Sequence, residues 1–361
     1  MQATPLEDLK TQGLLTSSEL PDIIKEEITK LEPSNKKQPA NLDKSDLEPE
    51  TILYTKDLLF VAQLPEGIVV NDGKILTKDC VIIKDTQTSP ENDQIKLREL
   101  DEKFLYYNGR LAVISSPGSE NWYHWLVQVL PRLAILKESK IEYDHIYING
   151  LEEWHKTSLK KFLSCNGINE EKLLIINEDC IIKARELIVP SVPHIPCKGH
   201  HGLSWLEETL EGVFLKDDTE CETYDKIYIS RANASSRKII NEEEIKCKLE
   251  DLDFEILYLE KLSPEVQAKI FAHAKIIAGP HGSGFANLIF AEPGFKLIEI
   301  DYEKERSYFK EMTEQLGGQY ELYHVKSEDI SENADPEKDP NMKLCDDFFI
   351  RLSGHLGEIN T

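Results

Sequence analysis

A glycine-rich segment late in the chain, residues 274–300, constrains the fold more than any other stretch. Residues 275–278 form a short apolar run that predicts a buried strand, and the turn of residues 279–284 follows it. Apolar side chains then recur at helical spacing until a Pro-Gly pair ends the helix, and residues 296–300 predict a second strand. This order of strand, turn, helix and strand is typical of a parallel α/β sheet.

The turn itself has the composition of an anion-binding loop. Gly279, Gly282 and Gly284 lack a Cβ, so we expect positive φ angles and a backbone that can lie close to a ligand. The first N–H groups of the following helix favour an anion, and His281 and Ser283 lie within the turn. The spacing matches neither the dinucleotide fingerprint nor a P-loop. The turn alone therefore leaves two interpretations open, a phosphate site and a tight turn without a ligand.

Length and charge limit the classes of protein to consider. A chain of 361 residues is long enough for two domains, and its net charge of −24 argues against a nucleic-acid surface, which requires a basic face. No apolar run reaches transmembrane length and residues 1–13 show no signal-peptide pattern, so we expect a cytoplasmic protein. The seven cysteines include no C-x-x-C pair, which argues against a zinc site or a disulfide framework.

The strand and helix patterns divide the chain into four parts. Residues 1–48 are polar and contain several prolines, which predicts an N-terminal arm and linker. Residues 49–215 predict an α/β domain with an added β-meander, and residues 216–330 predict a second, Rossmann-like domain. Residues 331–361 predict an acidic linker and a C-terminal helix.

A histidine near the start of a predicted helix is a candidate for acid–base chemistry. Residues 121–137 have the periodicity of a helix, in which Pro131 should introduce a kink. His124 lies between aromatic neighbours in its first turn, and an imidazole there suits a general base near neutral pH. Glu120, just upstream, is the alternative base. A purely structural histidine in an aromatic cluster is the competing interpretation.

Two arginines are expected at the same sheet edge as the glycine turn. Arg231 directly follows the predicted strand of residues 226–230, and Arg237 lies in the loop after it. Because the carboxyl ends of parallel strands meet at one edge, both guanidinium groups should approach the turn, where they could bind a diphosphate. The alternative is that these arginines pair with Glu242 or Glu243 at the surface.

A glutamate is the candidate for nucleoside recognition. Glu299 lies in the strand that follows the glycine-turn helix, where a carboxylate could accept hydrogen bonds from ribose hydroxyls. The alternative is a strand residue that faces solvent.

Three segments together resemble glycosyltransferase family 61. They are residues 121–133, with Asn-Trp-Tyr-His-Trp-Leu and Leu-Pro-Arg-Leu, residues 229–242, with both arginines, and residues 279–300, with Gly-Pro-His-Gly-Ser-Gly. The resemblance extends over residues 100–305 and is strongest to the bacterial members, which act in the cytosol on surface glycans. It implies a two-domain, GT-B-like fold, inverting transfer, a UDP-linked sugar donor and no obligatory metal.

The sequence therefore predicts an inverting glycosyltransferase that moves a sugar from a UDP-linked donor to a hydroxyl of a glycan acceptor, in polysaccharide or glycoconjugate synthesis. Residues 49–215 would hold the acceptor and residues 216–330 the donor. We expect no cofactor or metal, and no nucleic acid or transmembrane segment; peripheral contact with a membrane-bound acceptor and a homo-oligomer stay open. The alternative is a non-catalytic nucleotide-binding scaffold or sensor on the same fold.

Overall fold

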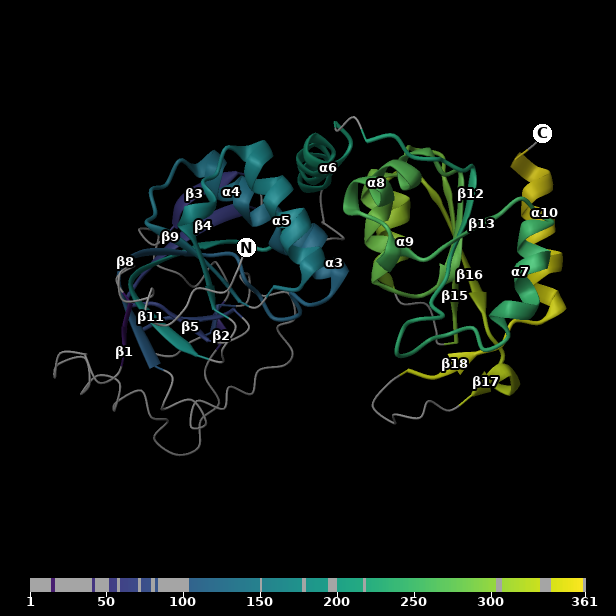
Figure 1. Cartoon of the computed structure of the whole chain (residues 1–361), viewed down its shortest axis with the longest axis horizontal. Coiled ribbons are helices and arrows are strands. Elements are labelled where there is room, and N and C mark those ends of the chain that lie inside the picture. Colours follow the sequence, from purple (N-terminus) through teal and green to yellow (C-terminus); the bar gives the residue numbers. More distant parts are fainter. Residues whose placement is uncertain are drawn as a thin grey trace. The chain divides into compact units, whose positions relative to one another are not determined.

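The chain folds into two compact units (Figure 1). The first unit comprises Met1–His194 and Ser204–Thr209, and the second comprises Ile195–Leu203 and Leu210–Thr361. The structure is a computed structural model that describes residues 14–16, 41–42, 52–56, 59–70, 73–78, 82–83, 104–149, 151–176, 180–193, 200–216, 219–302, 307–331 and 339–359. Most of the predicted N-terminal arm and most of the acidic linker lie outside these residues.

Parallel strands form the centre of the sheet in the first unit. They run in the order β10-β9-β8-β11, and each adjacent pair is parallel. Apolar runs at residues 111–115, 145–148, 172–176 and 181–189 predict four strands here, and β8 begins seven residues before the first of these runs. The strands are β8 (Phe104–Val113), β9 (His145–Asn149), β10 (Leu173–Ile176) and β11 (Ile181–Pro190).

Shorter strands extend this sheet. β11 pairs antiparallel with both β4 and β5, and β5, β6 and β7 pair antiparallel in succession. Leu14–Thr16 pairs with β8, so part of the segment predicted as an arm belongs to the sheet. The added strands are β1 (Leu14–Thr16), β2 (Asn41–Leu42), β3 (Ile52–Lys56), β4 (Leu59–Pro65), β5 (Ile68–Val70), β6 (Lys74–Leu76) and β7 (Ile82–Ile83).

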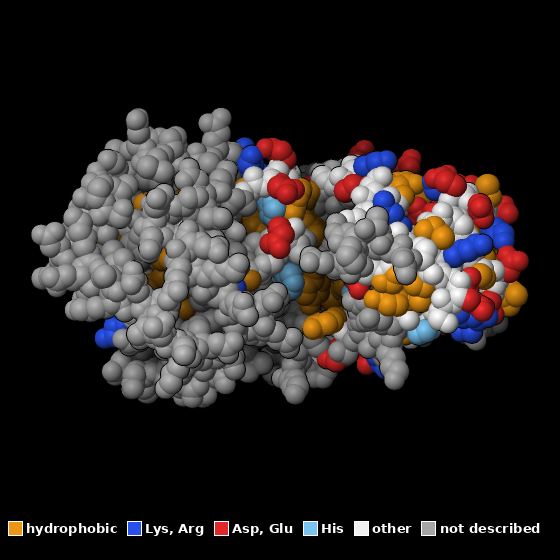
Figure 2. All heavy atoms as spheres, turned by 90° about the horizontal axis from the view of Figure 1, so that it is seen from below, with side chains coloured by type: hydrophobic (Ala, Val, Ile, Leu, Met, Phe, Trp, Pro, Cys, Tyr) orange, Lys and Arg blue, Asp and Glu red, His pale blue; other side chains and the backbone are white. Residues whose placement is uncertain are grey.

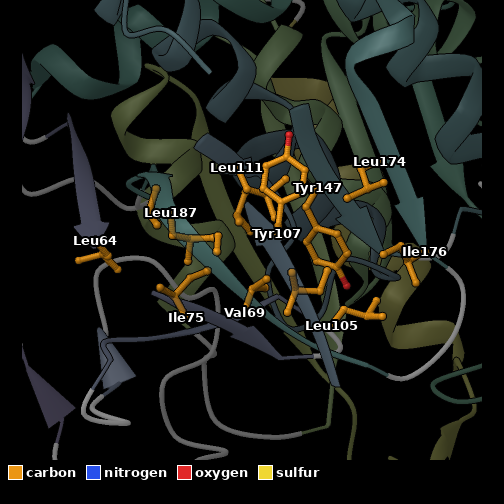
Figure 3. Packing of buried hydrophobic residues seen from close by; sticks show 14 of the residues in the cluster. Leu64, Val69, Ile75, Leu105, Tyr107, Leu111, Tyr147, Leu174, Ile176 and Leu187 are labelled. Atoms are coloured by element: carbon orange, nitrogen blue, oxygen red, sulfur yellow. The ribbon is translucent and has the colours of Figure 1, made fainter. Parts of the chain in front are cut away.

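One continuous apolar cluster holds the strands of this sheet together (Figure 3). Leu111 and Leu187 come from the central strands, Tyr147 and Leu174 from β9 and β10, and Ile75 from β6. All five side chains are buried, which stabilises the unit through removal of apolar surface from water.

The helix predicted for residues 121–137 is broken into three segments around Pro131. α3 (Trp122–His124) leads into a π-helical turn, η6 (Trp125–Val129), and Pro131 is the first residue of α4 (Pro131–Ser139). Because proline has no N–H, the chain restarts the helix there, and the N–H of Leu130 donates to the carbonyl of Trp125 at 3.0 Å. Helices α5 (Glu153–Asn166) and α6 (His200–Phe214) and the 3₁₀ turn η7 (Glu170–Lys172) follow.

The second unit is a parallel sheet with helices on both faces. Its strand order is β13-β12-β14-β15-β16, and every adjacent pair is parallel. Helices α7 and α10 cover one face, and α8 and α9 cover the other (Figure 1). The strands are β12 (Lys226–Ile229), β13 (Glu255–Leu257), β14 (Ile276–Pro280), β15 (Lys296–Asp301) and β16 (Gln319–His324); the helices are α7 (Glu242–Glu250), α8 (Pro264–His273), α9 (Ser307–Gln315) and α10 (Asp346–Ile359).

Helix caps in this unit test the sequence patterns directly. Ser263 caps α8 by accepting from the N–H of Val266 at 3.4 Å, and Pro264 takes the first helical position, as predicted. The pattern Asn-x-x-Glu predicts Asn241 as the N-cap residue of α7 and a capping box with Glu244. Asn241 does take the N-cap position, but its side chain makes no capping hydrogen bond, so the predicted box is absent. The Asn241 side chain instead accepts from the N–H of Leu344 at 3.0 Å and donates to its carbonyl at 2.9 Å, which holds the C-terminal segment at the start of α7.

The C-terminal segment is part of the core of the second unit. Phe348 and Leu352 of α10 join the apolar cluster that also contains Tyr228 and Ile298. A two-stranded ribbon of β17 (Ile330–Ser331) and β18 (Asn341–Met342) precedes the helix, after the 3₁₀ turn η10 (Ser327–Asp329). On the face of this unit drawn in Figure 2, acidic and basic side chains are interspersed with apolar ones. Among the described residues, no helix combines the length and apolarity needed to cross a membrane.

Candidate functional site

The glycine turn lies at the carboxyl end of β14, in the middle of the parallel sheet. The helix that follows it is η9 (Ser283–Phe290), a 3₁₀ helix, whereas the periodicity suggested an ordinary helix. Gly279 has φ +158°, but Gly282 is extended at 179° and Gly284 has no positive φ, so the expectation of positive φ fails at Gly282 and Gly284. Glycine is needed there for space instead of for backbone conformation.

Arg231 occupies the space that the missing Cβ of Gly282 leaves open. A Cβ built on Gly282 would lie 2.1 Å from Nη1 of Arg231, which is far inside van der Waals contact. The Arg231 side chain is held from the other side by the carbonyl of Ser236, which accepts from Nε at 3.3 Å and from Nη2 at 3.1 Å. The structure thus brings together Arg231 and the turn, as the sheet topology predicted.

The charge of the Arg231 guanidinium is only partly compensated by nearby acidic side chains. Burial, followed by the charge of Arg237, lowers the pKa of Arg231 to about 10, and Asp339 opposes this shift. The guanidinium is therefore still protonated at neutral pH, and a bound anion would relieve both unfavourable effects. Glu242 and Glu243, the alternative partners, are engaged elsewhere: Glu242 accepts from Ser230 at 2.6 Å and Glu243 pairs with Lys246.

Arg237 lies near Arg231 but has a protein partner. Its Nη1 is 2.6 Å from Oδ2 of Asp339, and Asp339 also accepts from the hydroxyl of Tyr302 at 2.9 Å. Arg237 has the left-handed φ of 55°, and its Nε is buried with no hydrogen-bond partner among the described residues. The charge of Arg237 is thus largely compensated, and Arg231 is the stronger candidate for an anion ligand.

His281 and Glu299 are joined to each other and to a third residue. Nδ1 of His281 is hydrogen-bonded to Oε1 of Glu299, and Oε2 of Glu299 accepts from the hydroxyl of Tyr320 at 2.7 Å. The Glu299 side chain is only 1% exposed, against 12% for His281. Glu299 does not face solvent, which was the alternative interpretation. Ribose hydroxyls could reach this carboxylate only if one of its two hydrogen bonds opened.

Asn287 fixes the other end of the turn. Its Nδ2 donates to the carbonyl of Gly284 at 3.0 Å and to Oε1 of Gln267 in α8 at 2.9 Å. A Cβ on Gly284 would lie 2.7 Å from Cδ1 of Leu259 in the 3₁₀ turn η8 (Leu259–Lys261). The backbone of the turn is therefore packed on both sides before any ligand binds.

His124, the candidate base in the first unit, has one defined hydrogen-bond partner for its Nδ1. Nδ1 of His124 lies 2.6 Å from Oε1 of Gln128, which is 5% exposed and belongs to the π-helical turn. With this acceptor, Nδ1 carries the proton and Nε2 has the lone pair that a general base requires. A Cβ on Gly118 would lie 2.9 Å from Cδ2 of His124, so the preceding loop packs directly on the ring. Glu120, the alternative base, is exposed in that loop.

The buried side chains of Arg132 and His155 hold the loop that precedes His124, residues 114–121, through hydrogen bonds to its main-chain carbonyls. Arg132, fully buried, donates to the carbonyls of Ile114, Ser115 and Pro190 at 2.7 to 3.0 Å. His155 contacts the carbonyl of Ser119 through Nε2 at 3.1 Å, and burial lowers its pKa. Burial also lowers the pKa of Arg132 to about 9. The loop is thus rigidly held at the carboxyl ends of β8 and β11.

Some of these residues were missed by the sequence analysis. Tyr320 belongs to a strand with no strong pattern of its own. Gln128, in contrast, follows from the helical spacing, which places it one turn after His124 on the same line of the predicted helix. His155 and Arg132 bond main-chain carbonyls, so neither has a charged partner in the sequence to mark it. Among the described residues, no group of three or more His, Cys, Asp or Glu side chains could hold a metal ion.

The fold and the two sets of side chains define a mixed α/β protein of Rossmann-like type with polar groups at the carboxyl ends of its parallel strands. Residues 122–298 match the family model described as Glycosyltransferase 61. This match confirms the resemblance to glycosyltransferase family 61 drawn from the three sequence segments. The segment includes His124, Arg231 and the glycine turn, whereas Glu120 and Glu299 lie just outside it. A comparison with curated proteins finds no match.

Proposed function

We propose that this protein is an inverting glycosyltransferase that transfers a sugar from a UDP-linked donor to a hydroxyl of a glycan acceptor. The observation that carries the proposal is the guanidinium of Arg231 packed on Gly282, at the carboxyl end of a parallel sheet. A charge-assisted, bidentate contact from Arg231 and the N–H groups of residues 282–284 would bind the donor diphosphate. The match of residues 122–298 to the Glycosyltransferase 61 model supports transfer chemistry over other nucleotide-binding functions.

The protein must stabilise negative charge on the leaving diphosphate and remove a proton from the acceptor hydroxyl. The bond between the anomeric carbon and the diphosphate oxygen breaks, and its electron pair stays on the diphosphate, which fixed cationic donors stabilise without a metal. His124 would take the proton of the attacking acceptor hydroxyl through Nε2, with Gln128 holding the ring. In this proposal Arg237 lies near the diphosphate and adds positive charge there. Glu299 lies beneath the glycine turn and is hydrogen-bonded to His281. The units would form a GT-B-like pair, with the acceptor held by the first.

Donor turnover tests this function. We expect the protein to release UDP from a UDP-sugar slowly in the presence of EDTA, and faster when a suitable glycan acceptor is added. His124→Ala should lower kcat by about 10²–10⁴-fold with little change in the affinity for UDP. An unchanged kcat would remove His124 from the role of base, and Glu120→Gln would then be tested in the same assay.

A non-catalytic nucleotide sensor is the competing function, since the fold alone does not define activity. The hydrogen bond between Nδ1 of His124 and Gln128 directs Nε2 away from Gln128 as the free ring nitrogen of a candidate base, which favours the enzyme, because a sensor has no need of a base. Binding of UDP without turnover, across a panel of sugars and acceptors, would favour the sensor.

A further inference from the structure

A partly buried polar line beneath the glycine turn, called the His-Glu-Tyr line below, consists of His281, Glu299 and Tyr320. His281 directly follows β14, and Glu299 and Tyr320 lie in the neighbouring strands β15 and β16. In the sheet register, Gly279 of β14 pairs with Glu299 of β15, and Leu297 of β15 pairs with Tyr320 of β16. Side chains two residues apart along a strand share a face, so His281, Glu299 and Tyr320 all project to the face that carries α8 and α9. The register itself therefore dictates this line.

The hydrogen bonds of the His-Glu-Tyr line are suited to fix the orientation of the His281 ring. Glu299 is 1% exposed, and burial of a carboxylate is costly unless hydrogen bonds compensate it. Both of its oxygens are used, one by Nδ1 of His281 and the other by the hydroxyl of Tyr320. The ring of Phe309 lies 5.2 Å from the ring of His281 and limits its rotation. A carboxylate bound to one imidazole nitrogen fixes the ring and determines the role of the other nitrogen.

We propose that Glu299 and Tyr320 are positioning residues that hold His281 with Nδ1 protonated, so that Nε2 is the atom that meets the donor diphosphate. This inference rests on the proposed function and assigns Glu299 to His281 in place of the ribose. In the UDP complex, Nε2 also carries a proton and donates it in a hydrogen bond to a phosphate oxygen. The charge of the imidazolium is then balanced by Glu299 on one side and by the diphosphate on the other.

The transfer step is consistent with this arrangement. As the acceptor oxygen forms its bond to the anomeric carbon, the bond to the diphosphate oxygen breaks and its electron pair adds negative charge to UDP. The Nε2–H of His281 stays on the imidazole, and its hydrogen bond strengthens as that charge develops. Loss of the orienting carboxylate should therefore lower kcat as well as affinity for UDP.

The direct test is the protonation state of His281, measured from ¹⁵N shifts of imidazole-labelled protein and assigned with His281→Gln. We expect a protonated Nδ1 in the free protein and two protonated nitrogens in the UDP complex. A bare Nδ1 in the free protein, which would mean that Glu299 donates the proton, overturns the proposal. The measurement on the free protein does not depend on nucleotide binding.

Affinity for UDP provides the second test. We expect Glu299→Gln to weaken UDP binding about 10- to 100-fold and Tyr320→Phe about two- to tenfold. The matched controls are Glu314→Gln and Tyr308→Phe, at exposed positions of α9, and both should bind as the wild type does. In the His281→Gln background, Glu299→Gln should have no further effect on affinity.

The outcomes separate this inference from the proposed function. If the wild type binds UDP but Glu299→Gln and Tyr320→Phe fold and bind it equally well, the positioning role is refuted while the proposed function stands. If the wild type binds no UDP, the proposed function fails, and the role of His281 toward a diphosphate fails with it.

Discussion

Gly282→Ala is the substitution that most sharply tests the placement of Arg231. The added methyl would lie 2.1 Å from Nη1 and 3.1 Å from Cζ of Arg231, so the guanidinium must leave its position. The backbone at Gly282 is extended, with φ 179°, and alanine adopts that conformation without strain. The atom that must move is the end of a flexible side chain, so the cost in stability should be about 1 kcal/mol, at the low end for overpacked sites.

The effect on nucleotide binding should be much larger than the effect on stability. A hydrogen bond to a charged group contributes about 1.5–3 kcal/mol, so displacement of Arg231 should weaken UDP binding about 10- to 150-fold. Isothermal titration with UDP measures this, with Gly212→Ala as the matched control. Gly212 lies in helix α6, and a Cβ there would lie 4.0 Å from Nζ of Lys216, which is ordinary contact. Gly212→Ala should therefore leave the affinity for UDP unchanged.

A double-mutant cycle decides whether the loss passes through Arg231. Arg231→Ala should weaken UDP binding at least as much as Gly282→Ala, and the two changes together should be no worse than Arg231→Ala alone. If Gly282→Ala still costs tenfold in the Arg231→Ala background, the methyl blocks the ligand directly. If Gly282→Ala binds UDP normally, Arg231 does not contact the diphosphate.

Three further predictions concern the same sites. Gly279→Ala should destabilise the protein by about 1–3 kcal/mol in urea unfolding, because its Cβ would lie 2.8 Å from the backbone oxygen of Ile229, which cannot move aside; a smaller loss would contradict the packing. Arg132→Met should cost at least about 2 kcal/mol, since it leaves three buried carbonyls without donors, whereas the exposed control Arg185→Met should cost little. Because burial lowers the pKa of Arg231 to about 10, the free site loses its positive charge as pH rises through that value, so UDP affinity should fall there; affinity that stays level in still-folded protein would argue against Arg231 as a ligand.

The sequence predicted those parts of the site that depend on local pattern. The strand, turn and strand around Gly279 follow from apolar runs and glycine positions, and their parallel pairing follows from the alternation of strands and helices. The shared sheet edge then places Arg231 beside the turn without any knowledge of side-chain contacts. Local pattern and topology were sufficient there because each step uses neighbours in the sequence or in the sheet.

The features that the sequence did not predict depend on distant partners. Asn241 has the residue type of a helix cap but bonds Leu344, 103 residues later, and Arg237 pairs with Asp339, 102 residues later. Both partners lie in the C-terminal part of the chain, whose weak patterns predict only an acidic linker and a C-terminal helix. The hydrogen bond from Tyr320 to Glu299 required the register of β15 and β16, which no single strand pattern contains.

The measurement that tests the central claim most directly is a thermal-shift screen of UDP, GDP, CMP and ADP on the wild-type protein and Arg231→Ala, with and without EDTA. A ligand at about 100 times its Kd stabilises a folded protein by about 2.7 kcal/mol, which such a screen detects readily. We predict a shift with UDP that survives EDTA and is lost in Arg231→Ala. If none of the four nucleotides shifts the melting temperature, the proposed donor site is contradicted and the glycine turn is a purely structural element.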